Sequence, residues 1–218
     1  MRAFFFDLDG TLIESKGIIS ELINETLMEF GYAPFTEDEM LASIGILLEG
    51  LFSLKADKEI VPKMCQCYVD KYLKTGLQKM KTYEGVVELL RELKDDKIKM
   101  GIVTTKSEEE AKQVTEHFGF SPYVDIIVGH SGKRKTKPKP DPIPHACSLL
   151  SITPDKTVMI GDTQVDIRAG KHAGVFATIG VLWGVGTEED LQEAGLCSAH
   201  FGGELEKCIK KIKDQLIG

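Results

Sequence analysis

The chain has 218 residues, 42% of them hydrophobic and 28% charged, and a formal net charge of −7. This length and composition suit one core with an insertion and exclude a disordered or fibrous protein. The acidic total disfavours nucleic acid as a partner, because surfaces that bind nucleic acid are basic. No apolar run approaches the ~20 residues of a membrane helix. We therefore expect a soluble, cytoplasmic protein without a membrane or nucleic-acid partner.

The first predicted element is a strand at residues 3–6. These residues are apolar throughout and stop abruptly at Asp7, as a buried strand does at the edge of a sheet. The run is far too short for a signal peptide. Asp9 follows, and the Asp9-Gly10 pair is typical of a tight turn. Such a turn at Gly10 would let backbone amides approach a phosphate group.

A block of helices is expected next, over residues 15–81. Apolar residues recur at helical spacing between residues 19 and 30 and again between residues 60 and 72. Thr36 and Glu39 have the spacing of a capping box. No convincing strand interrupts this stretch, so the sequence indicates a small helical domain inserted after the first strand.

The remainder of the chain alternates between apolar runs and amphipathic segments. The runs are Met100–Val103, Ile126–Val128, Val158–Ile160 and Val175–Val181. This alternation predicts a mainly parallel sheet with helices between its strands. Ser107 and Glu110 form a second capping box, which predicts a helix over residues 108–118.

Polar residues stand where the predicted strands end. They are Asp7, Asp9, Thr104 and Asp162, and the loop that holds Lys137 can join them. Open parallel sheets bind ligands beyond the carboxyl ends of their strands. Crowded carboxylates repel one another and repel phosphate, and a hard divalent cation such as Mg²⁺ relieves both repulsions. The sequence therefore predicts a metal-assisted site for a phosphorylated ligand.

These residues also suit a two-step phosphoryl transfer. Asp7, with a metal beside it, can attack phosphorus and form a covalent intermediate. Asp9 can protonate the departing oxygen and later deprotonate the attacking water. Thr104 can donate a hydrogen bond to the phosphoryl group, whose oxygens Lys137 can hold by its charge.

Four motifs at these positions resemble those of the haloacid dehalogenase superfamily. Asp7–Leu12 reads DLDGTL and resembles the first motif, DxDGTL. Thr104 ends an apolar strand, as in the second motif. KPKP at Lys137–Pro140 resembles the third motif, KPxP, and GDTQVD at Gly161–Asp166 resembles the fourth, GDxxxD. The motifs occur in the family's order and cover the chain outside the helical block.

The resemblance implies an α/β fold with two domains. A Rossmann-like core, with a central parallel sheet flanked by helices, would comprise residues 1–14 and 82–218. A mobile all-helical cap domain, inserted after the first strand, would comprise residues 15–81.

The resemblance also implies roles for single residues. Asp7 would be the nucleophile and Asp9 the acid/base. Mg²⁺ would be held by Asp7, the Asp9 backbone carbonyl and Asp162, with Asp166 supporting the metal through water. Phosphate binding is expected at Gly10, Thr104, Thr105 and Lys137.

Within the superfamily, the chain looks most like the phosphoglycolate phosphatase and pyrophosphatase branch. Ile44-Gly45, Tyr83–Val86 and Leu182–Gly184 carry this similarity. The expected function is a Mg²⁺-dependent phosphatase for small phosphorylated metabolites, with phosphoglycolate as the first candidate substrate. The enzyme would be a monomer or a homodimer.

Three alternatives remain open. A phosphomutase resembling β-phosphoglucomutase would use the same Asp7 and Asp9 but return the phosphoryl group to substrate. An inorganic pyrophosphatase would act on an anhydride instead of an ester. A regulatory or binding protein could keep the fold without turnover, although the intact set of acids counts against it. Carbon–halogen hydrolysis is disfavoured, because metal-independent dehalogenases lack the acid that Asp9 supplies.

Overall fold

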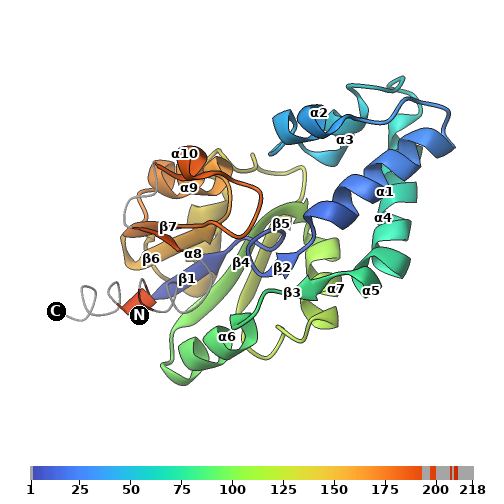
Figure 1. The fold of residues 1–218 in the computed structure, drawn as a ribbon. Helices are drawn as coiled ribbons and strands as arrows, with labels where there is room; N and C mark the ends of the chain where they lie inside the picture. The colour runs from blue at the N-terminus through green and yellow to red at the C-terminus, as the bar shows by residue number, and fades with distance from the viewer. Residues whose placement is uncertain (1, 193–196, 200–206, 208, 211–218) are drawn as a thin grey trace. The chain divides into compact units, whose positions relative to one another are not determined.

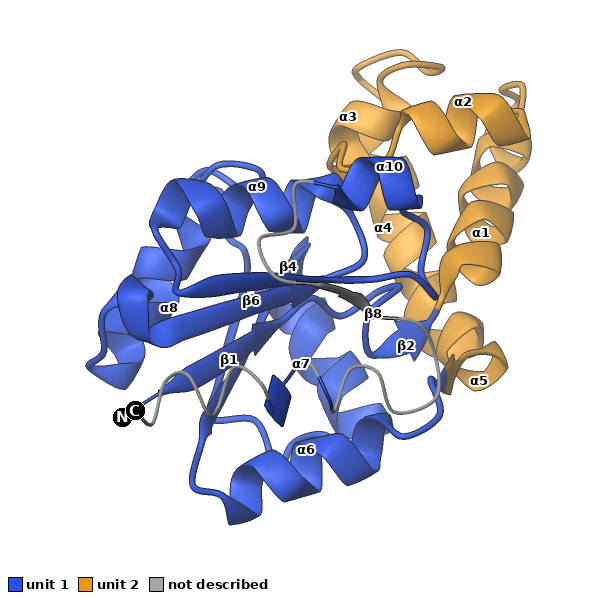
Figure 2. Cartoon of the chain, turned by 60° about the vertical axis from the view of Figure 1, so that its left-hand side comes forward, with its two compact units in different colours: residues 1–14, 82–218 blue, residues 15–81 orange. Residues whose placement is uncertain are grey.

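The computed structural model describes residues 2–192, 197–199, 207 and 209–210. The chain divides into two compact units, coloured differently in Figure 2. The first unit comprises Met1–Glu14 and Thr82–Gly218, and the second comprises Ser15–Lys81. Each unit buries its own set of hydrophobic side chains.

A six-stranded parallel sheet forms the centre of the first unit (Figure 1). The strands lie in the order β5-β4-β1-β6-β7-β8, and every neighbouring pair is parallel. Their bounds are Ala3–Phe6 (β1), Lys99–Ser107 (β4), Ile126–His130 (β5), Thr157–Gly161 (β6), Ala177–Val181 (β7) and Cys197–Ala199 (β8). The predicted α/β fold with a parallel central sheet is confirmed. Because β1 lies between β4 and β6, the residues that follow these strands meet at the carboxyl ends of the sheet's central strands.

The shortest strands are the ones that the sequence does not predict. β2 (Ile13–Glu14) and β3 (Lys81–Thr82) form a separate two-stranded sheet, and β8 lies at one edge of the large sheet. Each has only two or three residues. Such lengths give no measurable hydrophobic period, so only tertiary pairing defines these strands.

Helices cover both faces of the large sheet, as Figure 2 shows. α6 (Val86–Asp95) and α7 (Glu108–His117) lie on one face, and α8 (Pro142–Leu150) and α9 (Gln164–Ala173) lie on the other. A short helix, α10 (Glu188–Leu191), follows β7. With both faces covered, residues on either side of a strand are buried, which explains the unbroken apolar run of β1.

The start of α7 is set by local hydrogen bonds. The Ser107 hydroxyl accepts the Glu110 backbone N–H, and the Glu110 carboxylate accepts the Ser107 backbone N–H, both at 3.2 Å. This is the predicted capping box, now confirmed. The helix ends at His117, one residue earlier than predicted, and Gly119 beyond it takes a positive φ of 71°. The capping box therefore begins α7 directly behind the end of β4.

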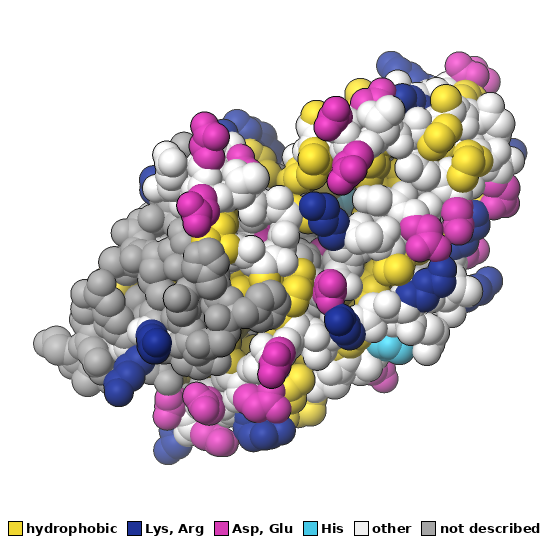
Figure 3. Space-filling model, viewed as in Figure 1, with side chains coloured by type: hydrophobic (Ala, Val, Ile, Leu, Met, Phe, Trp, Pro, Cys, Tyr) yellow, Lys and Arg dark blue, Asp and Glu magenta, His cyan; other side chains and the backbone are white. Residues whose placement is uncertain are grey.

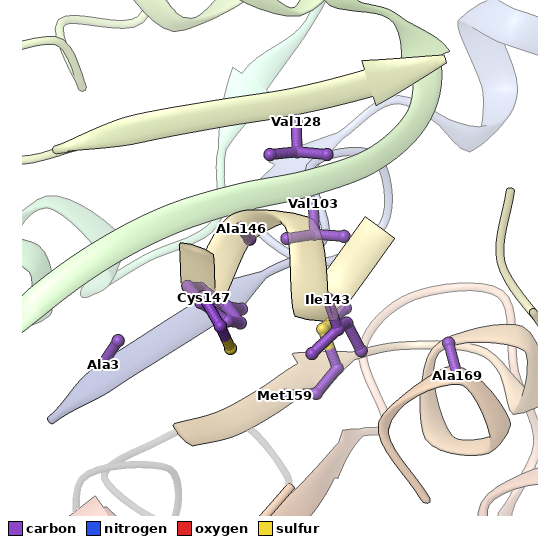
Figure 4. Packing of buried hydrophobic residues seen from close by; sticks show 9 residues of the cluster. Ala3, Val103, Val128, Ile143, Ala146, Cys147, Met159 and Ala169 are labelled. Atoms are coloured by element: carbon purple, nitrogen blue, oxygen red, sulfur yellow. The ribbon is translucent and has the colours of Figure 1, made fainter. Parts of the chain in front are cut away.

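Figure 4 shows the packing of α8 and α9 against the sheet. The cluster consists of Ala3, Phe5, Val103, Val128, Ile143, Ala146, Cys147, Met159 and Ala169. All of these side chains are at most 2% exposed. Burying one valine, isoleucine or phenylalanine side chain stabilises a fold by roughly 1.5–3 kcal/mol. This packing makes the sheet a firm support for the residues at its strand ends.

The second unit is the helical block that the sequence predicts. Its elements are α1 (Lys16–Glu29), α2 (Glu37–Ala42), α3 (Leu48–Phe52), α4 (Val61–Lys71), a π-helical turn (Tyr72–Gly76) and α5 (Leu77–Lys79). The predicted capping box of Thr36 and Glu39 is present. Tyr68 stacks on the fully buried Tyr72, with ring centroids 5.9 Å apart. The apolar stripes are thus core, as expected, and the role of this unit as a cap stays a prediction.

The surface that Figure 3 shows mixes both signs of charge. Acidic and basic side chains alternate over it, and the described residues on this face form no continuous basic surface. In the parts of the chain that the structure describes, no helix has the length and hydrophobicity needed to cross a bilayer.

Candidate active site

Two neighbouring strands and one helix bring three of the predicted acids together. Asp7 directly follows β1, and its backbone N–H donates to the carbonyl of Ile160 in β6 at 2.8 Å. Asp162 directly follows β6, and Asp166 lies in the first turn of α9. One carboxylate oxygen from each acid lies within 4.8 Å of the others, and all three side chains are buried. We call these three residues the carboxylate cluster.

Lys137 supplies one positive charge to this cluster. Its side chain is 1% exposed, and its Nζ lies 3.0 Å from Oδ1 of Asp7 and 2.5 Å from Oδ1 of Asp166. Burial alone would lower the pKa of Lys137, but the adjacent Asp166 and Asp7 raise it above its ordinary value. The lysine therefore stays charged, and its ammonium contacts two of the three carboxylates in the cluster.

Burial and the neighbouring acids both raise the pKa values of Asp7 and Asp162. Burial raises the pKa of Asp7 from 3.8 to about 6, and Asp166 adds to the rise while Lys137 opposes it. Burial, followed by repulsion from Asp166 and Asp7, raises the pKa of Asp162 to about 8. Both shifts have the direction expected of carboxylates that lack enough positive charge nearby.

Asp162 is held tightly from several sides. Its Oδ1 accepts the Thr11 hydroxyl at 3.0 Å, and its Oδ2 accepts the Val185 backbone N–H at 2.9 Å. A Cβ atom placed on Gly10 or Gly184 would collide with the Asp162 carboxylate. The loop after β7 and the turn after β1 thus enclose this side chain closely, and glycine leaves the space that it fills.

Asp166 serves two neighbours at once. Its Oδ2 accepts the Thr163 backbone N–H at 3.1 Å and the Thr163 hydroxyl at 2.7 Å, which caps the start of α9. Its Oδ1 accepts from Lys137. Asp166 thus receives three hydrogen bonds, whereas each oxygen of Asp162 receives one, so the geometry favours a supporting role for Asp166 over direct coordination of a cation.

The carboxylate cluster fits a hard divalent cation. Oδ1 of Asp7 is buried and receives no hydrogen bond from any described residue, although the Lys137 ammonium lies near it. Carboxylate oxygens are the protein ligands that Mg²⁺ prefers. Asp7 and Asp162 could hold such an ion through these oxygens, and its charge would offset the repulsion that raises their pKa values.

Asp9 lies apart from the carboxylate cluster and has its own lysine. Its Oδ2 is 3.1 Å from Nζ of Lys106, and its side chain is 20% exposed. Lys106 follows the predicted Thr104, whose buried hydroxyl oxygen accepts the Lys106 backbone N–H at 3.3 Å. Thr105 is half-buried between them. Among the predicted acids, Asp9 thus has the most exposed side chain, which gives water or a leaving group access beside it.

Sequence analysis missed three residues that hold the acids in place. Thr11 and the Val185 backbone bind Asp162, and Lys106 pairs with Asp9. Thr11 stands inside the DLDGTL motif, so the motif offered a signal for it. Val185 contributes only its backbone, and a lysine at a strand end is too common to stand out.

Gly10 makes the tight turn that the sequence predicts. Its φ is +76°, and its N–H donates to the carbonyl of Ile13 at 2.9 Å. A hydrogen bond from Trp183 Nε1 to the Thr11 carbonyl, at 3.1 Å, also holds this turn. The space that Gly10 leaves for Asp162 is an observed role, whereas its part in binding phosphate stays a prediction.

Known proteins share this fold and these motifs. The family model of the haloacid dehalogenase-like hydrolases matches residues 4–181. A phosphoglycolate phosphatase from Aquifex aeolicus is 34% identical over 188 residues, which cover 84% of this chain and 86% of that protein. Pyrophosphatase PpaX from Bacillus pumilus is 34% identical over 216 residues, or 99% of this chain and 95% of that protein.

A solved structure extends the comparison to three dimensions. The crystal structure of a predicted phosphatase from Clostridium acetobutylicum matches with a TM-score of 0.81 and 28% identity, over 98% of each chain. The family match includes all four motifs found in the sequence. The predicted enzyme class, a phosphatase of this family, is confirmed by these relatives. The chain belongs to the haloacid dehalogenase-like hydrolase family.

Proposed function

We propose that the chain is a Mg²⁺-dependent phosphatase that hydrolyses small phosphorylated metabolites through an aspartyl-phosphate on Asp7. The observation that carries the proposal is the buried cluster of three carboxylates, two of which contact Lys137. The similarity to a phosphoglycolate phosphatase makes phosphoglycolate-type monoesters the first candidate substrates.

The proposed metal ligands are Asp7, Asp162 and the backbone carbonyl of Asp9. Asp166 would support the ion through water, since its oxygens receive three hydrogen bonds whereas each oxygen of Asp162 receives one. When bound, Mg²⁺ would neutralise the charge that builds up on the phosphoryl group.

In the first step, an Asp7 carboxylate oxygen attacks phosphorus. Asp9 donates its proton to the departing oxygen as the bond from that oxygen to phosphorus breaks. The alcohol leaves, and the phosphoryl group remains bonded to Asp7. Asp9 suits this role because its partly exposed carboxylate lies outside the crowded cluster.

In the second step, Asp9 takes a proton from a water molecule that attacks phosphorus. The bond between phosphorus and the Asp7 oxygen breaks, which releases inorganic phosphate and restores the Asp7 carboxylate. Lys137, already 3.0 Å from Asp7, is placed to hold the phosphoryl oxygens in both steps. Thr104, Thr105 and the turn at Gly10 would donate the remaining hydrogen bonds.

The second unit, residues 15–81, is proposed to act as the cap. A cap would close over the substrate to exclude water during the first step and open for the second.

Inorganic pyrophosphate is a second candidate substrate. The Bacillus pumilus relative named pyrophosphatase PpaX matches 99% of this chain. The same attack by Asp7 would cleave a phosphoanhydride, with phosphate in place of an alcohol as leaving group.

Phosphate release from a panel of small esters and pyrophosphate, with Mg²⁺ or with EDTA, tests the proposal. Asp7→Asn should lower turnover at least about 10³-fold, because the amide cannot act as the nucleophile. Asp95→Asn is the matched control, since Asp95 is an exposed residue at the end of α6. Release that survives in Asp7→Asn would refute the nucleophile assignment. A required bisphosphate activator would identify a mutase instead.

A further inference from the structure

Lys106 is a nearly buried lysine that none of the four motifs contains. Its side chain is 9% exposed, and its Nζ lies 3.1 Å from Oδ2 of Asp9. By contrast Lys112, on α7, is 54% exposed and pairs with Glu108 one turn away on the same helix. Lysine is seldom buried without a strong partner. Asp9 is such a partner, and the pairing holds the Lys106 ammonium beside the proposed acid/base.

An irregularity in the sheet accompanies this position. β4 and β5 pair regularly up to Val103 and Val128, and they pair again at Ser107 and His130. Four steps along β4 thus match two steps along β5, so that β4 bulges where Lys106 stands. Bulges beside active sites turn side chains toward the site. Here the bulged segment carries both the Thr104 hydroxyl and the Lys106 ammonium.

Building on the proposed function, we infer that Lys106 selects substrates whose leaving group carries a negative charge close to the leaving oxygen. That oxygen takes its proton from Asp9, so it must come within about 2.7 Å of the Asp9 carboxyl group. Lys106 contacts the same carboxyl group. When Oδ2 of Asp9 donates the proton, the ammonium therefore lies within about 6 Å of the leaving oxygen. An anionic group one or two bonds from that oxygen is within its reach.

This geometry defines a class of substrate by its chemistry. Esters of 2-hydroxy acids carry a carboxylate two bonds from the leaving oxygen, and a phosphoanhydride carries a second phosphate directly on it. Both place an anion beside Lys106, whereas an ester of a neutral alcohol brings no anion to its ammonium. One lysine thus accounts for a site that accepts an acidic ester and an anhydride.

Binding to the Asp7→Asn variant tests the inference without turnover. Calorimetry with Mg²⁺ would compare 2-phosphoglycolate with 2-hydroxyethyl phosphate, which replaces the carboxylate by a neutral hydroxymethyl group. We expect 2-phosphoglycolate to bind about tenfold more tightly or better, the usual effect of one charged hydrogen bond. Adding Lys106→Met should erase this preference, and adding Lys106→Arg should retain most of it.

Two further variants serve as controls for this result. Lys112→Met removes an exposed lysine of α7 and should leave the preference unchanged. Lys106→Gln repeats the loss of charge with a polar side chain, in case methionine disturbs the fold. Equal affinity for the two ligands, or a preference that persists in both Lys106→Met and Lys106→Gln, would overturn the inference. Turnover by the native protein is scored separately, so absent hydrolysis with intact binding preference would refute only the proposed phosphatase.

Discussion

Two groups of charged side chains occupy opposite ends of the same sheet. At the amino ends of β4 and β5, Asp125 accepts hydrogen bonds from Lys94 at 3.2 Å, Lys99 at 3.0 Å and the Met100 N–H at 2.9 Å. At the carboxyl ends, Lys137 contacts Asp7 and Asp166 of the carboxylate cluster, and Asp162 is held by Thr11 and the Val185 backbone. In the first group two lysines contact one acid, whereas in the second one lysine contacts two of three acids.

Burial acts to raise the pKa of the acids in both groups, and only at Asp125 do the neighbouring groups reverse the rise. Burial alone would raise the pKa of Asp125, but the Met100 N–H and the two lysines hold it below its ordinary value. In the carboxylate cluster the pKa values of Asp7 and Asp162 rise to about 6 and about 8. The same residue types thus form a satisfied structural contact at one end and an incomplete site at the other. A bound cation would supply the positive charge that this site lacks.

Asp162→Asn should have the largest effect on this comparison, because it removes an excess charge and a proposed metal ligand together. The asparagine oxygen can still accept the Val185 N–H, and its amide can donate to the Thr11 hydroxyl. The fold should therefore persist while turnover falls at least about 10²-fold. Phosphate release against Mg²⁺ concentration checks this, with Asp125→Asn as the control from the other group. Unchanged Mg²⁺ dependence in Asp162→Asn would contradict the proposed metal site.

Gly184→Ala should weaken metal binding without changing any charge. Gly184 has backbone angles open to any residue, but its added Cβ would collide with the Asp162 carboxylate and displace it. We expect Mg²⁺ affinity to fall about 10- to 100-fold, as it does when groups behind metal ligands are altered. The rise in unfolding temperature with added Mg²⁺ measures this apart from activity. Gly17→Ala, with open space around its Cβ, should leave the Mg²⁺ response intact; an equal response in Gly184→Ala would contradict the expected displacement.

The sequence predicts the acids of the site because they follow local signals. Asp7 and Asp162 stand where apolar runs stop, and parallel pairing brings those stops to one edge. Lys106 escaped prediction because its role depends on a bulge between β4 and β5, which no local pattern records. Val185 escaped because a backbone N–H can come from any residue. What one sequence hides is therefore mainly the support that distant segments give to predicted residues.

The secondary structure likewise divides into elements that the local sequence predicts and elements that it does not. Long apolar runs and capping boxes predict β1, β4, β6 and α7, since a buried strand or a helix start is determined largely by its own residues. The two-residue strands β2 and β3 exist only through their pairing with each other. Local physics therefore accounts for the frame of the first unit, and tertiary contacts account for its short additions.

The smallest expected effect concerns folding stability without metal. Its dependence on pH should have opposite signs in the two groups. Because the folded-state pKa values of Asp7 and Asp162 are raised, the stability they contribute is complete below 3.8 and is lost as pH rises through about 6 and about 8. Asp125 is the reverse: its pKa is lowered, so its contribution is present above 3.8 and is lost as pH falls through the lower, folded-state pKa.

Urea unfolding in EDTA at pH 5, 6.5 and 8 measures this difference. Asp162→Asn resembles the protonated acid, so its stability relative to the native protein should increase from pH 5 to pH 8 by at least about 1 kcal/mol. Asp125→Asn should instead cost about 1–2 kcal/mol at all three pH values, because its lysines and the Met100 N–H lose their charged acceptor throughout this range. A constant difference for Asp162→Asn would mean that its carboxylate is already neutralised by its neighbours. The carboxyl ends of the sheet would then need no cation, and the contrast between the two groups would disappear.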